Sequence, residues 1–346
     1  MRLHTYIIGF ILLLISCKKE AKVASGQLDN YYFVKVGDVA LPVRVCGNIN
    51  SDIAIVFNHG GPGGSAQGER AYAYWKEIEK YYKVVYWDQR GSGLTQGNTD
   101  PGTITIEQFS EDLDNIVDFT KQVVKADKIF IHGISWGGGL TTYYLLDTLH
   151  QKKVKGAIVE APAYDLKHGI MQLSVNWLLQ RADSMLALHV NDAYWQNVKD
   201  IYAAYPAITN VHMFQQHLSF LGQVNGIVYN TSNLAAQAIT LPKYESFVGS
   251  YNSMFTINHL SYNQASLFEM DLTDQLYKIK VPLLLIWGRK DGLLPFDNLA
   301  QKYADNYGGS DIKFEPYRYD VSAHLPHAEQ YQEFQIDALK FIELHK

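Results

Sequence analysis

The feature of this sequence that most restricts its fold is a series of short, continuous apolar runs separated by longer segments. The runs occupy residues 53–57, 83–87, 128–131, 154–159, 281–287 and 312–319. Unbroken apolar strands are typical of a sheet covered on both faces. Strands that alternate with helices form a parallel sheet, so the pattern predicts an α/β fold.

The segments between these runs have helical periodicity. Residues 106–124 carry apolar side chains at three- and four-residue intervals, and residues 136–149 and 327–344 are similar. Two more β-rich runs, at residues 31–36 and 42–46, predict a hairpin that precedes the alternating part.

The first residues predict export rather than a part of the fold. Residues 6–15 form an apolar run that is too short to span a bilayer, and it follows a positively charged start. The run leads into Leu14-Ile15-Ser16-Cys17, which resembles a bacterial lipobox. We therefore predict a lipoprotein signal peptide at residues 1–17, lipidation of Cys17, a polar tether at 18–27 and anchoring to a bacterial cell-envelope membrane. An ordinary secretory signal with a chance cysteine is the alternative.

Length and composition exclude several classes of protein. The roughly 320 residues after the tether exceed the usual single core, so one large domain with an insertion, or two domains, is expected. The net charge of −5 offers no basic surface for nucleic acid. Cys46 is the one cysteine besides Cys17, so there is no disulfide framework and no zinc-ligand spacing.

Residues 161–270 interrupt the alternation and are poor in charge. They contain 10 Asp, Glu, Lys or Arg residues in 110 positions, about 9%, against 19% for the whole chain. We predict a helical segment that lies across an apolar cavity. A buried helical subdomain with no pocket, or a surface that faces the membrane, would also explain the composition.

Ser135 is the candidate nucleophile. It lies in Gly133-x-Ser135-x-Gly137, after a predicted strand and before a predicted helix, which is the context of a nucleophile elbow. The turn is so sharp that the residues two positions away must be small. A serine that merely caps the helix is the alternative.

A nucleophilic serine needs a base and an acid that orients the base. Asp291 follows the apolar run 281–287, and His324 lies before the last predicted helix, so the order is serine, acid, histidine. His327, in the first turn of that helix, competes for the role of base. Glu160, at the end of the run 154–159, competes for the role of acid.

A tetrahedral intermediate needs two N–H donors. The backbone N–H of Trp136, directly after Ser135, is one candidate, and that of Gly61 in the glycine-rich loop 59–65 is the other. The loop does not match a phosphate-binding loop, because no Gly-Lys-Ser/Thr follows it.

Four motifs together resemble the α/β-hydrolase fold and, more narrowly, the proline iminopeptidase-like serine peptidases of family S33. They are HGGPGG at 59–64, WDQRGSG at 87–93, GISWGG at 133–138 and GRKDGLLP at 288–295. The resemblance implies a mostly parallel eight-stranded sheet flanked by helices, with a core at 28–160 and 271–346 and an inserted helical cap at 161–270. It also implies a Ser135–Asp291–His324 triad, an oxyanion hole from the Gly61 and Trp136 amides, and no metal or other cofactor.

The family binds the free α-amine of its substrate with glutamates, mostly from the cap, and their local motifs are missing here. Glu160 and Glu245 are the candidate substrate-binding residues. Glu269, Asp183 and Asp192 are further acids that no motif places.

Three functions follow from these observations. The first is a cofactor-free aminopeptidase that releases N-terminal residues from short peptides. The second is an esterase or amidase for small apolar substrates without a free amine, which the charge-poor cap permits. The third is a ligand-binding lipoprotein with a dormant hydrolase site.

Overall fold

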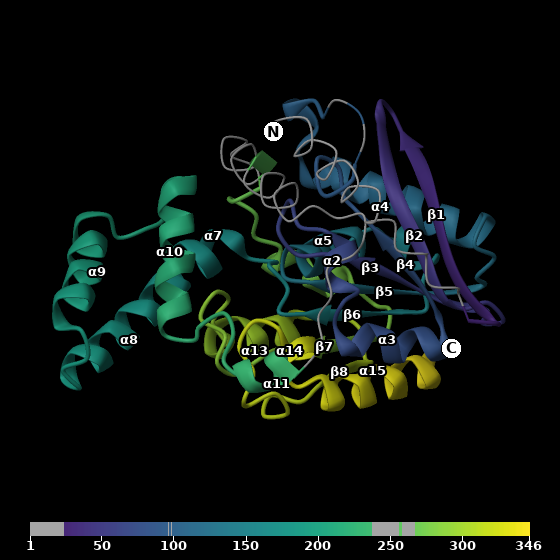
Figure 1. Cartoon of the computed structure of the whole chain (residues 1–346). Helices are drawn as coiled ribbons and strands as arrows, with labels where there is room; N and C mark the ends of the chain where they lie inside the picture. The colour runs from purple at the N-terminus through teal and green to yellow at the C-terminus, as the bar shows by residue number, and fades with distance from the viewer. Residues whose placement is uncertain (1–23, 96, 98, 237–255, 258–266) are drawn as a thin grey trace, which may run out of the picture.

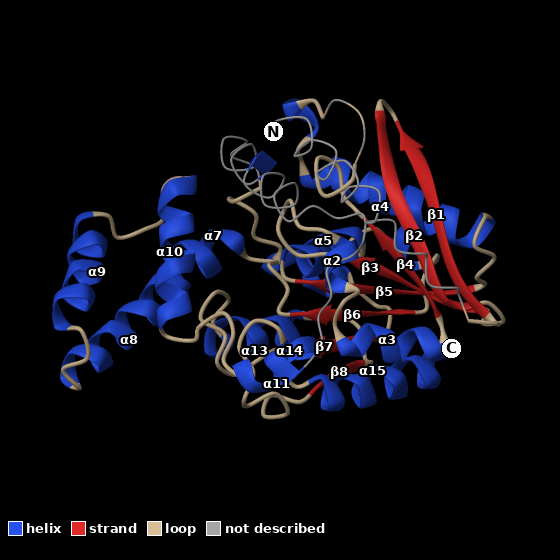
Figure 2. Cartoon of the chain, in the orientation of Figure 1, coloured by secondary structure: helices blue, strands red, loops and turns tan. Residues whose placement is uncertain are grey.

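An eight-stranded sheet forms the centre of the protein (Figures 1 and 2). The computed structural model describes residues 24–95, 97, 99–236, 256–257 and 267–346. The strand order is β1-β2-β4-β3-β5-β6-β7-β8. The strands are β1 (Gln27–Val36), β2 (Val39–Asn48), β3 (Ile53–Asn58), β4 (Lys83–Trp87), β5 (Lys128–Ile134), β6 (Gly156–Glu160), β7 (Leu283–Ile286) and β8 (Ile312–Phe314). β2 pairs antiparallel with β1 and β4, and the other pairs are parallel, which confirms the predicted mostly parallel sheet.

Helices cover both faces of the sheet, as the continuous apolar strands require. In β3, Ala54 and Val56 belong to the core on one face, whereas Ile55 and Phe57 belong to the core on the other. The first core is completed by α4 (Ile106–Gln122), α5 (Trp136–Tyr144) and α13 (Phe296–Asn306), and the second by α3 (Ala73–Tyr81) and α15 (Tyr331–His345).

Some predicted elements are shorter or divided. The helix predicted at 136–149 ends at Tyr144, and a new short helix, α6 (Thr148–Gln151), begins where the Asp147 carboxylate accepts the N–H of Leu149 at 2.7 Å. The helix predicted at 327–344 is divided into α14 (Pro326–Glu329) and α15. β8 ends at Phe314 instead of continuing to residue 319, because Pro316 cannot donate a ladder hydrogen bond.

The segment between β6 and β7 is helical in its described part, as predicted. It contains α7 (Leu166–His168), a π-helical turn (Gly169–Ser174), α8 (Val175–Ala187), α9 (Asp192–Ala204), α10 (Val211–Gln223) and α11 (Thr231–Ala236), and the 3-10 helix η3 (Thr273–Lys278) leads into β7. In Figure 1, α8, α9 and α10 lie together to the left of the sheet. We refer to residues 161–236 as the cap segment.

The predicted signal peptide and most of the tether lie outside the described residues, and β1 begins at the last tether residue, Gln27. Across the part of the chain that the structure describes, no helix has the length and apolar character needed to cross a membrane. Cys46 is buried in β2.

Candidate active site

Ser135 occupies a strained turn between β5 and α5. Its φ is 55° and its ψ is −121°, a region that serine rarely adopts. A Cβ on Gly133 would lie 2.2 Å from the carbonyl oxygen of Gly137, and a Cβ on Gly137 would lie 2.1 Å from that of Asn58. The Gly-x-Ser-x-Gly spacing is therefore a steric requirement of the turn. The Ser135 side chain makes no capping hydrogen bond to α5, so the helix-capping alternative has no support.

The glycine-rich loop 59–65 is held against the loop that follows β4. The Gln89 side chain donates to the carbonyl oxygen of His59 at 3.0 Å and accepts from the indole N–H of Trp136 at 2.8 Å. His59 Nε2 in turn accepts the backbone N–H of Gln89 at 3.1 Å. Burial lowers the pKa of His59 to about 4, so its ring is a neutral acceptor near pH 7. Three of the four motifs thus form one hydrogen-bonded frame.

This frame places the glycine-rich loop beside the serine. A Cβ on Gly60 would lie 3.4 Å from the Cβ of Ser135, so the loop passes directly beside it. Gly61 has a φ of 136°, which only glycine adopts without strain, and it lines the cavity described below. Trp136 is the first residue of α5, so its backbone N–H has no acceptor within the helix.

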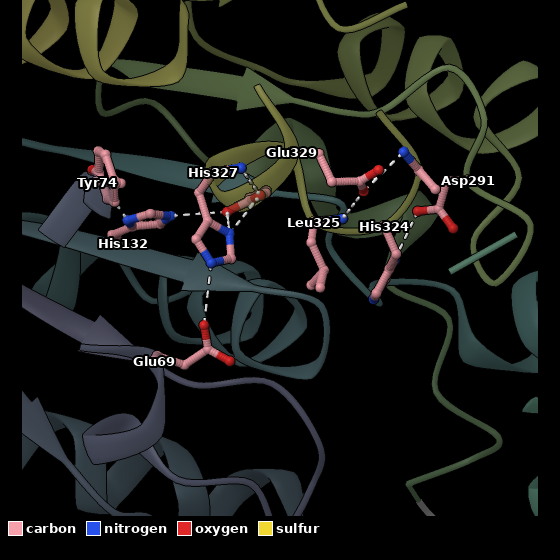
Figure 3. Close-up of polar contacts among 10 residues, drawn as sticks. Glu69, Tyr74, His132, Asp291, His324, Leu325, His327 and Glu329 are labelled. Atoms are coloured by element: carbon pink, nitrogen blue, oxygen red, sulfur yellow. Dashed lines mark hydrogen bonds and ion pairs between the residues drawn. The ribbon is translucent and has the colours of Figure 1, made fainter. Parts of the chain in front are cut away.

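Asp291 and His324 are brought together although they are 33 positions apart in the sequence. Asp291 Oδ2 lies 2.8 Å from His324 Nδ1 (Figure 3). The other carboxylate oxygen accepts the N–H groups of Leu293 and Leu294, both at 2.9 Å, which fixes its orientation. Burial lowers the pKa of His324, but the Asp291 carboxylate outweighs it and the net shift is upward. His324 Nε2 has no hydrogen-bond partner among the described residues.

Ser135 and His324 both line a cavity of about 460 Å³ between the core and the cap segment. Its apolar lining includes Phe214 and Leu218 from α10 and Leu293 and Leu325 from the core. The cap segment therefore contributes to the walls of the site. A larger surface hollow of about 640 Å³, bordered by α4 and α5, contains none of the predicted site residues.

Glu69, which the sequence reasoning missed, also lines the cavity that contains Ser135 and His324. It is the last residue of α2 (Ala66–Glu69), four positions after the glycine-rich loop. Its Oε2 lies 3.1 Å from Nε2 of His327, and Nδ1 of the same ring lies 2.9 Å from Oε1 of Glu160 (Figure 3). Glu160 Oε2 lies 3.3 Å from Nε2 of the buried His132. The only sequence signal for Glu69 was its position just after the HGGPGG motif.

The His327 ring is an imidazolium between two carboxylates. Burial lowers its pKa, but Glu160 and then Glu69 raise it to about 10. For Glu160, burial raises the pKa, but His327 and His132 lower it to about 2. Two carboxylates and one imidazolium leave a formal charge of −1 beside the cavity.

The described carboxylates that were candidates for substrate binding do not line the cavity. Glu160 is fully buried behind His327 and is not part of the cavity lining, because its oxygens accept from His327 and His132. Among the described residues, the hydrogen-bond partner of the His324 ring is Asp291 rather than Glu160. Glu245 lies outside the described residues. The other candidates form exposed ion pairs: Glu269 with Lys167, Asp183 with Lys199, and Asp192 with His189.

One cluster of possible metal ligands occurs among the described residues. Asp165, His168 and Asp271 hold ligand atoms within 4.8 Å of one another. Protein groups already satisfy them: Asp165 accepts from Lys302 at 3.2 Å and contacts His168 at 2.9 Å, and Asp271 accepts the N–H of Thr273 at 2.9 Å. This cluster is an ion-pair network at the start of the cap segment.

A sheet of this strand order, with a serine at a strained strand-to-helix turn, defines the α/β-hydrolase fold. The sequence profile of the family described as "Serine aminopeptidase, S33" matches residues 50–228, more than half of the chain. The chain belongs to this S33 family and is a serine hydrolase that resembles the proline iminopeptidases.

Individual relatives agree with this assignment. The chain is 26% identical over 295 residues to a "Probable aminopeptidase YbaC" of Bacillus subtilis (strain 168), covering 80% of this chain and 84% of that one. It is 27% identical over 274 residues to a "Proline iminopeptidase" of Saccharolobus solfataricus, covering 78% of each. Among solved structures, that of VinJ superposes with a TM-score of 0.62 at 20% identity, over 92% of this chain and 99% of VinJ, a likeness of fold.

Proposed function

We propose that this protein is an aminopeptidase of the proline iminopeptidase type, which releases N-terminal residues from short peptides. The observation that carries the proposal is the Glu69 carboxylate in the cavity wall that Ser135 and His324 share. Together, Glu69, His327 and Glu160 leave one formal negative charge, and the described lining contains no Lys or Arg. Such a wall favours a substrate ammonium group, since a charge-assisted hydrogen bond is about twice as strong as a neutral one.

The proposed reaction uses Ser135 as nucleophile and His324 as base. His324 Nε2 accepts the Ser135 hydroxyl proton while Oγ attacks the carbonyl carbon of the first peptide bond. The N–H groups of Gly61 and Trp136 stabilise the oxyanion. His324 then gives the proton to the leaving amine as the C–N bond breaks. Water attacks the acyl-enzyme by the same proton route and regenerates Ser135. Asp291 stabilises the imidazolium form of His324.

A second candidate function is hydrolysis of small apolar esters or amides that lack a free amine. The observation in its favour is the apolar part of the lining, Phe214, Leu218, Leu293 and Leu325. The two functions share their chemistry and differ in whether the substrate amine is recognised.

The test compares substrates that differ only in that amine. Protein that starts at Lys18 is given prolyl and alanyl coumarin amides, their N-acetylated forms and p-nitrophenyl esters. Cleavage restricted to the free-amine substrates supports the aminopeptidase. Cleavage of esters or blocked amides, with the free-amine amides untouched, establishes the second function. If no substrate shows Ser135-dependent turnover, both enzymatic functions are contradicted and a ligand-binding lipoprotein is favoured.

Glu69→Gln is expected to lower kcat/KM for free-amine substrates about 10- to 100-fold, since hydrogen bonds to charged groups contribute about 1.5–3 kcal/mol. The Gln oxygen can still accept from His327, so the fold is retained. Turnover of a p-nitrophenyl ester is expected to stay within about twofold. Glu77→Gln, on the adjacent helix α3 and paired with Lys80, is the matched control. An equal loss on both substrate types would mean that Glu69 supports the site without binding the amine.

We also propose that the protein is exported and anchored by a lipid on Cys17. Replacing Cys17 by serine in the full-length chain removes the thiol that would carry the lipid. We expect the variant to move from the membrane fraction to the soluble fraction after cell breakage, while Cys46→Ser, at a buried position, leaves the distribution unchanged. A Cys17→Ser protein that still sediments with membranes and carries no lipid by mass spectrometry would refute the anchor.

A further inference from the structure

A single buried carboxylate holds the loop that carries His324. Glu329, the last residue of α14, is fully buried. Its Oε1 accepts the backbone N–H of Ala323 at 3.0 Å and that of Leu325 at 3.2 Å (Figure 3). These two residues flank His324, so one oxygen atom fixes the backbone on both sides of the ring.

The other oxygen of Glu329 binds the cap segment. Oε2 accepts the backbone N–H of Tyr229 at 2.6 Å and that of Asn230 at 2.7 Å. Four N–H donors thus share one carboxylate, whose two oxygens offer about four acceptor sites. Neutral donors satisfy the group, and the described residues include no ion pair to it. Burial raises the pKa of Glu329, and the N–H donors offset part of that rise.

The residues just before Tyr229 contact both loops of the Asp–His pair. The carbonyl oxygen of Ile227 accepts the N–H of His324 at 3.0 Å, and that of Gly226 accepts the N–H of Gly292 at 2.8 Å. Gly292 directly follows Asp291. Residues 226–230 of the cap segment therefore form a strut between the acid loop and the histidine loop, and Glu329 fastens its far end.

We propose that Glu329 is a positioning residue for His324, which sets the ring against Ser135 and couples that position to the strut 226–230. The proposal rests on the triad of the proposed function. The cap segment then helps to hold the base, His324, in place, and it also forms part of the cavity wall. Because a displacement of about 1 Å can cost on the order of 100-fold in rate, a loosened histidine loop reduces activity without contact with substrate.

If Glu329 had only a structural role, its substitution would change stability alone. If Glu329 positions His324, its substitution also changes the titration of His324. The charged groups that act on His324 are the carboxylates Asp291, Glu160 and Glu329, and all three raise its pKa. Glu329→Gln removes one of them and offers only one oxygen to four N–H donors. Glu329→Asp keeps the charge, but its side chain is one methylene shorter. The variant therefore distinguishes the effect of the charge from the effect of the hydrogen bonds that the longer side chain makes.

The experiment measures the rate at which a fluorophosphonate labels Ser135 between pH 4 and 9, a reaction that needs the base but no peptide substrate. We expect Glu329→Gln to lower the plateau rate about 10- to 100-fold and to move the acidic limb to lower pH. Glu329→Asp is expected to lower the plateau with the limb in place. Glu333→Gln, in the first turn of α15, is the control and should match the wild type.

The outcomes distinguish failure of the proposed triad from failure of the proposed role of Glu329. If His324→Ala is labelled as fast as the wild type, the triad itself is wrong. If His324→Ala abolishes labelling but folded Glu329→Gln keeps the wild-type rate and limb, the triad stands and the positioning role is overturned. Should Glu329→Gln fail to fold, Glu329→Asp decides, because a wild-type plateau in that variant is incompatible with the proposal.

Discussion

Ser135→Ala is expected to lower kcat by about 10⁴- to 10⁶-fold while the protein stays folded. The nucleophile is lost, and only the oxyanion donors and substrate binding continue to act. Stability should change little, because the described structure gives the hydroxyl no hydrogen bond and alanine adopts the same backbone with no added atoms.

The measurement pairs turnover of the best substrate with thermal unfolding. Ser184→Ala is the matched control, because Ser184 lies on the exposed side of α8 and bonds only to its own helix. A Ser135→Ala enzyme with more than about one tenth of wild-type activity would show that another residue is the nucleophile. A large drop in melting temperature would mean that lost activity reports unfolding.

Opposite consequences are expected for His324→Ala and His327→Ala, although the two histidines are only three positions apart. His324→Ala should lower kcat about 10⁴-fold or more, because it removes the base, and the remaining Asp291 carboxylate keeps the N–H groups of Leu293 and Leu294. His327→Ala should lower the free energy of unfolding by about 3–5 kcal/mol, because it leaves the fully buried Glu160 without its cation. His189→Ala, at an exposed position, is the control for both.

The pH dependence of stability distinguishes the two histidines further. The pKa of His327 is raised from 6.5 to about 10 in the folded state, so its stabilising effect is complete below 6.5 and is lost as pH rises through 10. The pKa of Glu160 is lowered from 4.5 to about 2, so its effect is complete above 4.5 and is lost as pH falls through 2. Urea unfolding of the wild type should show highest stability from these groups between pH 4.5 and 6.5.

In His327→Ala the decline between pH 7 and 10 should be much weaker, since the titrating group is gone. Suppose that His327→Ala loses as much activity as His324→Ala while its unfolding is unchanged. His327 would then act in catalysis, contrary to the proposed roles. Retained activity in His324→Ala would likewise exclude His324 as the base.

Local patterns were sufficient to predict the fold and the position of the serine. The strands and helices follow from apolar periodicity, which reflects burial on one or both faces of an element. The glycines around Ser135 follow from the steric demands of its turn, where a Cβ would overlap backbone atoms at 2.1–2.2 Å. Such constraints act within a few residues, so they remain visible in the sequence.

The roles of Glu160 and Glu69 could not be predicted in this way. Glu160 ends a strand, as a catalytic or binding acid would, yet its partner is His327, 167 positions away. Glu69 reaches the same ring from 258 positions away, and no motif marks it. Which carboxylate meets which ring depends on the paths of three separate loops.

The sequence by itself determined the α/β-hydrolase architecture, the helical character of the described cap segment and the sharp turn at Ser135. Only the tertiary structure decided that Asp291 meets His324, that Glu69 enters the cavity wall and that Glu329 ties the histidine loop to the cap segment. The physical reason is range. Backbone sterics and periodic burial act between near neighbours, whereas charge pairing and hydrogen bonding between distant loops depend on how the sheet brings those loops to one edge.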